Sequence, residues 1–357
     1  MTNDRIIIKE GEARDSALRK HSVGKLLRRI LTVFGVGFFL FLIFYVGWQN
    51  ILDNIAHFGI WFVVILLLQM VWVVPPAFSW YIIQNILCKR APLFFFLRIK
   101  IISDSMNTII PTANLGGDAL RVYLIGPRIP LKEGIAGILL DKTVESIAGT
   151  LFMVFGFLIN ILFFSIPKEL IMPAMICLLV LILAITLFIF FQVRGFYRSA
   201  MSFFGWIPAV CRLLIKNKET LCIIDENTRR LYTQGWGNIP LTTCLHFMGR
   251  LTGVFEVMII MWVLHQPVNF LEAWFISAAV TIGNTILFIV PGHWGVQEGM
   301  YVLVLKIMSF SPSVGLSLGI IRRIRRIFLL GLGLILFNLD KGTQRKGSIH
   351  PTHTGSF

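Results

Sequence analysis

The chain has 357 residues, of which 56% are hydrophobic and 14% are charged, and its mean hydropathy is +0.78. An average soluble domain carries about a quarter charged residues, so this composition excludes an ordinary soluble enzyme and indicates a membrane protein. The formal charge of +15 comes from 33 Lys and Arg against 18 Asp and Glu. These basic residues lie mostly between and beside apolar stretches, so we interpret them as determinants of topology and expect no nucleic-acid partner.

The N-terminal part predicts a cytoplasmic tail and two spans. Residues 1–29 are polar and basic and lead into an apolar stretch without a small-residue cleavage site, so we expect an uncleaved anchor. Residues 30–48 form the first span, and the loop after it, residues 49–57, contains no Lys or Arg. The second span, residues 58–87, returns to a loop that holds Lys89 and Arg90. The positive-inside rule therefore places residues 1–29 in the cytoplasm.

The segment 92–126 predicts a re-entrant helical hairpin. Its apolar run contains Arg98, Lys100 and Asp104 and is broken by Pro111, Gly116 and Gly117. Both flanks of the segment are basic, which favours entry and exit on the cytoplasmic side. Two further spans, residues 135–164 and 170–192, complete a first membrane half over residues 30–192.

The C-terminal part repeats this order in the opposite direction. Residues 193–238 are basic with interspersed aromatic residues, which predicts a cytoplasmic amphipathic linker. A span over residues 239–264 follows, and then a second hairpin over 270–308, broken at Pro291, Gly292 and Gly295. The last span, residues 313–339, closes a membrane half over 239–340 and leads to a basic cytoplasmic tail, residues 341–357. The predicted fold is an all-α polytopic membrane protein with about six full spans and two re-entrant hairpins arranged as inverted repeats.

The two hairpins share a short motif. Asn107-Thr-Ile-Ile precedes Pro111, and Asp118 follows that proline by seven residues; Asn284-Thr-Ile-Leu precedes Pro291, and Glu298 follows by seven. Opposite insertion of two such broken helices is the arrangement of transporters built from inverted repeats. A chance match of two short Pro/Gly segments is the alternative.

An arginine cluster lies inside the last predicted span. Arg322, Arg323, Arg325 and Arg326 follow its start by nine to thirteen residues, so Arg322 would lie about 14 Å deep. An arginine at the centre of a membrane helix costs about 2.5 to 3.5 kcal/mol on insertion scales, so the cluster requires carboxylates, water or a phosphate nearby. Guanidinium groups suit bidentate contacts with phosphate. The alternative is that the span begins later, which would leave the arginines at the membrane boundary.

Other ionisable residues in the apolar segments are candidates for a polar cavity. Asp141, Lys142 and Glu145 share one helix face and form either a self-neutralised seam or the carboxylate partners of Arg121 or of the arginine cluster. Arg121 follows Asp118 near a predicted helix N-terminus, where a phosphate is favoured. The remaining cavity candidates are Asn107, Asn284 and Glu298. The span 239–264 also contains the ionisable residues His246, Arg250 and Glu256, which are candidates of low specificity because many membrane proteins have ionisable residues in their spans.

At these residues the sequence resembles the flippase-like membrane region of lysylphosphatidylglycerol synthases and their stand-alone relatives. The resemblance covers about residues 92–339. It rests on Pro111-Thr-Ala-Asn-Leu-Gly-Gly-Asp-Ala-Leu-Arg121, Asp141-Lys-Thr-Val-Glu145, Pro291-Gly-His-Trp-Gly-Val-Gln-Glu-Gly299 and Arg322-Arg-Ile-Arg-Arg326. The branch associated with hopanoid biosynthesis is the most similar. The aminoacyltransferase domain of the full synthases has no counterpart in this sequence.

The resemblance implies a lipid translocase of the bacterial inner membrane with both termini in the cytoplasm. We expect Arg121 and the arginine cluster to bind an anionic phospholipid or isoprenoid-type lipid headgroup, and the acidic residues to balance charge. The sequence contains no catalytic, nucleotide-binding or metal-ligating pattern, so we expect no catalytic residues, metal or other cofactor. A homo-oligomer or a complex with lipid-synthesis enzymes is a possible assembly. The alternative function is a non-transporting scaffold for lipid-modifying enzymes.

Overall fold

A computed structural model describes residues 58–88, 90–108, 115–126, 128–163, 168–204, 206–286 and 296–339, with the single positions 37, 49 and 56. The predicted terminal tails and nearly all of the first span lie outside the described residues. The same holds for the two hairpin turns, with Pro111, Pro291, Gly292 and Gly295.

Secondary structure in the described residues is helical throughout, with no strand. The long helices are α3 (Ile60–Leu87), α6 (Leu131–Phe163), α7 (Lys168–Arg194), α11 (Ile239–Val263) and α14 (Pro312–Leu339). Shorter helices form the arms of the predicted hairpins: α4 (Leu93–Asn107) and α5 (Leu115–Ile125) in the first, α12 (Phe270–Ile286) and α13 (Val296–Ile307) in the second. The all-α prediction is confirmed.

Several of these helices are suited to a bilayer. Within the described residues, three segments are long and apolar enough to cross a membrane: Ile60–Leu87, Ile171–Arg194 and Trp236–Val263. The segment in α7 has a mean hydropathy of 3.2 and only 6% of it is buried in the protein, so this helix presents its side chains to lipid. Helices α6 and α14 are equally long but carry ionisable residues along their length. The chain is a multi-pass membrane protein, and the total number of spans stays a prediction.

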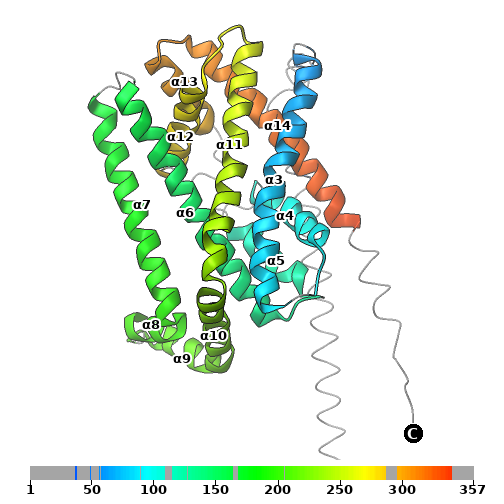
Figure 1. Ribbon diagram of the computed structural model, residues 1–357, viewed down its shortest axis with the longest axis vertical. Helices are drawn as coiled ribbons and strands as arrows, with labels where there is room; N and C mark the ends of the chain where they lie inside the picture. Colours follow the sequence, from blue (N-terminus) through cyan, green and yellow to red (C-terminus); the bar gives the residue numbers. More distant parts are fainter. Residues whose placement is uncertain are drawn as a thin grey trace, which may run out of the picture.

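The two halves pack with exchanged partners. Helix α4 of the first half contacts α14 of the second, and α12 of the second half contacts α6 of the first. Helices α3 and α11 contact each other and run in opposite directions along the bundle, and the pair α4 and α5 lies nearer one end than the pair α12 and α13 (Figure 1). The two predicted halves therefore share an extensive interface, and their relation as inverted repeats stays a prediction. The insertion depth of the hairpins stays a prediction.

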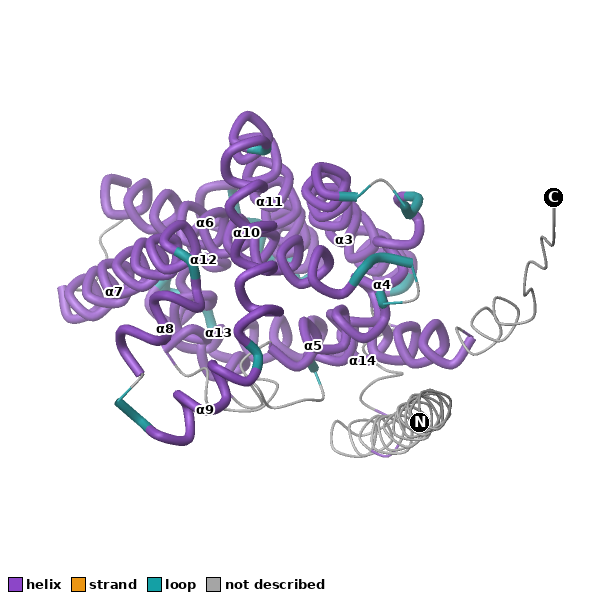
Figure 2. The backbone as a smooth tube through the Cα atoms, turned by 90° about the horizontal axis from the view of Figure 1, so that it is seen from below, coloured by secondary structure: helices purple, strands orange, loops and turns teal. Residues whose placement is uncertain are grey.

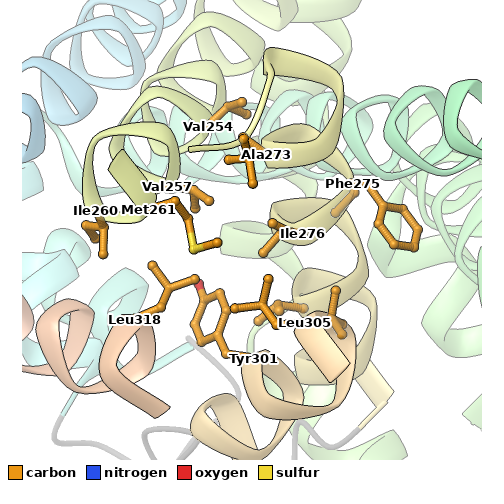
Figure 3. Packing of buried hydrophobic residues seen from close by; sticks show 14 of the residues in the cluster. Val254, Val257, Ile260, Met261, Ala273, Phe275, Ile276, Tyr301, Leu305 and Leu318 are labelled. Carbon is orange, nitrogen blue, oxygen red and sulfur yellow. The ribbon is translucent and has the colours of Figure 1, made fainter. Parts of the chain in front are cut away.

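An apolar cluster joins the second hairpin to α11 and α14. Figure 3 shows the ring of Tyr301 between Leu318 and Leu305, with Met261 and Ile276 above it, and all five side chains are fully buried. In a bilayer there is little hydrophobic driving force between helices, so close van der Waals packing holds such contacts. The cluster fixes the orientation of α13 and α14 beside the polar residues described below.

The predicted linker consists of three helices at one end of the bundle (Figure 1, Figure 2). They are α8 (Phe196–Phe204), α9 (Pro208–Lys216) and α10 (Lys218–Gln234), followed by a 3-10 turn, η1 (Trp236–Asn238). The Asp225 carboxylate of α10 accepts hydrogen bonds from the backbone N–H groups of Phe196 at 2.8 Å and Tyr197 at 2.9 Å, which caps the start of α8. Helix α10 also packs against α3 and α6. The linker is therefore an ordered layer, and its position on the cytoplasmic side stays a prediction.

Candidate lipid-headgroup site

A cavity of about 260 Å³ lies between the two halves of the protein. Side chains of α3, α4, α6, α11, α12 and α14 line it, so both halves contribute. Its ionisable lining residues are Asp104, Arg250, Glu256, Arg322, Arg325 and Arg326. Neutral polar side chains such as Gln69, Ser277 and Thr281 complete the wall. The cavity is polar although the surrounding helices are largely apolar.

The centre of α14 supplies three of the cavity arginines. The helix begins at Pro312 and continues to Leu339, so the cluster lies at its middle and not at its end. Positions 322, 325 and 326 share one helix face, as the i, i+3 and i+4 spacing predicts, and they line the cavity together. Arg323 faces another way and forms an ion pair with Glu298 of α13. The predicted depth of the cluster in the bilayer is still to be measured.

Glu256 of α11 holds two of these arginines in place. Its Oε2 atom accepts a hydrogen bond of 2.9 Å from Arg322 Nη2 and a second from Arg325 Nη1. Arg322 also donates to the Gly253 carbonyl at 2.7 Å and to the Tyr301 hydroxyl. Because Glu256 is only 1% exposed, this contact orients both guanidinium groups before any ligand arrives.

Arg250 of α11 and Arg326 of α14 also reach the cavity. Neither makes an ion pair or a side-chain hydrogen bond with any other described residue, in contrast to Arg322 and Arg325. Arg250 lies against Gly149 of α6, where an added Cβ would approach its Nη2 to 2.8 Å. The glycine therefore makes room for this guanidinium group.

A second charged cluster lies between α5, α6 and α11. Arg121 Nη1 lies 2.9 Å from Asp141 Oδ2, and His246 Nε2 lies 3.0 Å from Asp141 Oδ1. Arg121 and Asp141 are both fully buried, and the guanidinium group lies 4.7 Å from the centre of the Trp80 ring. The expected contact of Arg121 with a headgroup stays untested, and in the structure this residue has a carboxylate partner and does not line the cavity.

The arrangement of this cluster decides between the partners proposed for Asp141. It forms an ion pair with Arg121 and a hydrogen bond with His246, and it does not pair with the arginines of α14. Lys142 pairs with Asp118 at 3.2 Å and with Glu145 at 3.4 Å. Asp118 and Glu145 thus share one lysine in an ion-paired seam along α5 and α6, which lies beside the cavity and not in its wall.

The first hairpin is held by its asparagine. The Asn107 Oδ1 atom accepts a 2.7 Å hydrogen bond from the Gly117 backbone N–H, one of the donors that the start of α5 leaves without a helical partner. A Cβ at Gly117 would lie 2.5 Å from the Ser103 carbonyl oxygen. Close packing of the two arms therefore explains this glycine. Gly116 precedes it in α5, while Asn284 lies in α12 outside the cavity wall.

A neutral polar cluster joins the linker to the bundle. The Tyr232 hydroxyl of α10 donates to Gln192 Oε1 at 2.7 Å, and Gln192 Nε2 donates to the Thr143 hydroxyl at 3.0 Å. Burial raises the pKa of the Tyr232 hydroxyl, which keeps it a neutral donor at physiological pH. Nothing in the sequence alone marked this cluster, because its members lie on three helices.

Some residues of the cavity wall were predicted only weakly or not at all. Arg250 and Glu256 carried only the general sign of an ionisable residue in an apolar span, and Asp104 appeared only as an interruption of the first hairpin. Their alignment with α14 depends on helix packing. In the described residues, no group of three or more His, Cys, Asp or Glu is placed to hold a metal ion.

Comparison with known proteins assigns the chain to a family. The family described as the lysylphosphatidylglycerol synthase transmembrane region matches residues 32–333. No curated protein and no solved structure gives a significant match. The similarity to the hopanoid-associated branch stays a prediction. Since the match covers most of the sequence, the chain belongs to the family of lysylphosphatidylglycerol synthase transmembrane regions.

Proposed function

We propose that this protein is a lipid translocase that moves an anionic or otherwise modified polar lipid between the leaflets of a bacterial inner membrane. The observation that carries the proposal is the cavity between the two halves, with its excess of arginines over carboxylates. We propose further that the protein has no aminoacyltransferase activity and that both termini are cytoplasmic.

The charge of the cavity supports an anionic ligand. Four arginines and two carboxylates line it, and uncompensated charges away from bulk water are costly unless they are paired. A phosphate of a lipid headgroup supplies the missing negative charge and accepts bidentate hydrogen bonds from guanidinium groups. The acyl chains would stay in the surrounding hydrocarbon.

The exchanged packing of the halves supports movement of that ligand. In inverted-repeat transporters, the site lies where the repeats meet, and rocking of one repeat against the other opens it to alternate sides. The cavity is lined by α3, α4 and α6 from one half and by α11, α12 and α14 from the other. The sequence holds no nucleotide-binding motif, so we propose that lipid moves down its own gradient or with a coupled ion.

The test is a flipping assay in liposomes that contain a fluorescently labelled anionic lipid, phosphatidic acid in one set and phosphatidylglycerol in a second. Dithionite quenches the label on the outer leaflet only, so translocation appears as loss of the protected fluorescence. Wild-type protein should flip the lipid, and Arg322→Gln/Arg326→Gln protein should do so at least about tenfold more slowly, since each loses a charged contact.

The matched control is Arg229→Gln/Arg230→Gln, which removes the same charge from the exposed face of α10, where these side chains are 66% and 57% exposed. This variant should flip lipid at the wild-type rate. Equal rates for wild-type protein and protein-free vesicles in both sets would contradict translocation and favour a scaffold. Equal rates for wild type and the α14 variant would contradict the role of the arginines.

A further inference from the structure

The charges around the cavity do not balance. Asp104 already has Lys100 as a partner at 3.2 Å, and Glu256 is shared by Arg322 and Arg325. Four guanidinium groups and two carboxylates line the cavity, and because Lys100 already neutralises Asp104, only Glu256 is left to offset the four arginines.

Part of the excess lies on two arginines from different helices. Arg250 belongs to α11 and Arg326 to α14, and both line the same cavity without an ion-pair partner among the described residues. The nearest acidic groups outside the cavity wall also serve other cations: Glu145, on the Arg250 side, lies 3.4 Å from Lys142, and Glu298, on the Arg326 side, pairs with Arg323. Arg250 and Arg326, which have no direct ion-pair partner among the described residues, therefore face the same cavity.

The geometry points to a ligand with two negative charges at one end. We infer that the lipid bound in this cavity carries a terminal phosphate, as a phosphate monoester or diphosphate, and not the phosphodiester of phosphatidylglycerol or a zwitterionic headgroup. This inference rests on the proposed function for the presence of a lipid. A monoester has three terminal oxygens and carries nearly two charges above its second pKa, which lies near 6. A phosphodiester neutralises only one of the two arginines.

The cavity has room for the charged end of such a lipid. Its volume of about 260 Å³ is large enough for a phosphate group. A headgroup that ends in a phosphate brings its charge directly to the arginines.

Competitive binding tests the inference without requiring transport. Full-length protein is purified in mixed micelles that contain phosphatidic acid, phosphatidylglycerol and phosphatidylcholine in equal amounts, and the bound lipids are identified by native mass spectrometry. At pH 8, phosphatidic acid should be bound over phosphatidylglycerol by about tenfold, which is what one additional charge-assisted contact supplies. Equal binding of the two lipids would overturn the inference.

Three variants assign the preference to its arginines. Arg250→Gln and Arg326→Gln should each bring the binding ratio of phosphatidic acid to phosphatidylglycerol close to one. Gly149→Ala should lower the ratio as well, because its Cβ displaces the Arg250 guanidinium. The exposed control Arg229→Gln should keep the wild-type ratio. A wild-type ratio in both glutamine variants would overturn the assignment.

The ionisation of the ligand gives an independent readout. At pH 5 the phosphate monoester loses most of its second charge, so the preference over phosphatidylglycerol should shrink severalfold relative to pH 8. The phosphodiester of phosphatidylglycerol carries one negative charge at pH 5 and at pH 8. Its binding is therefore the control for any change in the charge of Asp104, Glu256 or the arginines over this pH range. A ratio that is the same at pH 5 and pH 8 would contradict two-charge recognition.

The source of the phosphate and the act of transport are separable outcomes. Inorganic phosphate at the concentration of phosphatidic acid should not displace the lipid, and displacement would overturn the assignment to a lipid. Preferential binding of phosphatidic acid without flipping would contradict translocation and leave this inference standing. Flipping of phosphatidylglycerol as fast as phosphatidic acid, with equal binding, would contradict this inference and leave translocation standing.

Discussion

Replacing Asp141 by asparagine should destabilise the protein by about 3 kcal/mol. The asparagine side chain would keep the shape and one oxygen acceptor, so the change removes mainly the charge that faces Arg121 at 2.9 Å and His246 at 3.0 Å. Loss of one partner from a buried ion pair costs about 3 to 5 kcal/mol because the other charge stays uncompensated. The lower value applies here, since Asp118 remains 3.5 Å from the Arg121 guanidinium.

Unfolding by sodium dodecyl sulfate in mixed micelles measures this change. The control is Glu226→Gln, which breaks an ion pair on α10 whose carboxylate side chain is 48% exposed and should cost under about 1 kcal/mol. The double variant Arg121→Gln/Asp141→Asn should cost less than the sum of the two single variants, because no charge is then left alone. Single-variant costs that add without coupling, or an Asp141→Asn protein as stable as the Glu226→Gln control, would refute the argument.

Three further substitutions probe contacts between helices by the same unfolding assay. Gly333→Ala should destabilise the protein by about 1 to 3 kcal/mol through overpacking, because the added Cβ would lie 2.3 Å from the Ser105 Cβ. Adding Ser105→Gly to this variant should restore part of the lost stability, and no restoration would contradict the contact. Gly117→Ala should destabilise the protein by at least as much, because its Cβ would lie 2.5 Å from a backbone carbonyl oxygen of α4. A variant as stable as wild type would contradict this packing of the hairpin arms. Tyr232→Phe should destabilise the protein by about 1 kcal/mol, because it removes one hydrogen bond between α10 and α7. It should also increase proteolysis of α10. Wild-type stability and wild-type proteolysis together would contradict a role of this hydrogen bond in holding α10.

The sequence predicted the helices and the faces of some of them. Hydropathy and proline positions placed the hairpin arms, and the spacing of Arg322, Arg325 and Arg326 predicted their common face because both depend on one helix at a time. The partners of these residues were not predictable in the same way. Glu256 lies 66 residues before Arg322, and only the packing of α11 against α14 brings them together. For the same reason, the position of Arg250 in the cavity wall was not predictable, since it depends on a glycine of another helix.

The two halves have the same predicted order of a hairpin and a following long helix, but they differ in charge at corresponding positions. In the first hairpin, Arg121 follows Asp118 by three residues and pairs with Asp141 of the next long helix. In the second hairpin, Tyr301 follows Glu298 by three residues and accepts a hydrogen bond from Arg322 of the next long helix. In the first half the cation is on the hairpin and is fully neutralised inside that half.

In the second half the cation is on the long helix, and its carboxylate comes from α11. The hydroxyl at position 301 takes no charge away from Arg322, so neutralisation depends on Glu256, which already serves Arg325 as well. One carboxylate shared by two guanidinium groups leaves α14 short of negative charge, whereas α5 and α6 have carboxylates to spare. All four arginines of the cavity wall therefore come from α11 and α14, so the positive charge on which the proposed anion site depends is supplied by the second half alone.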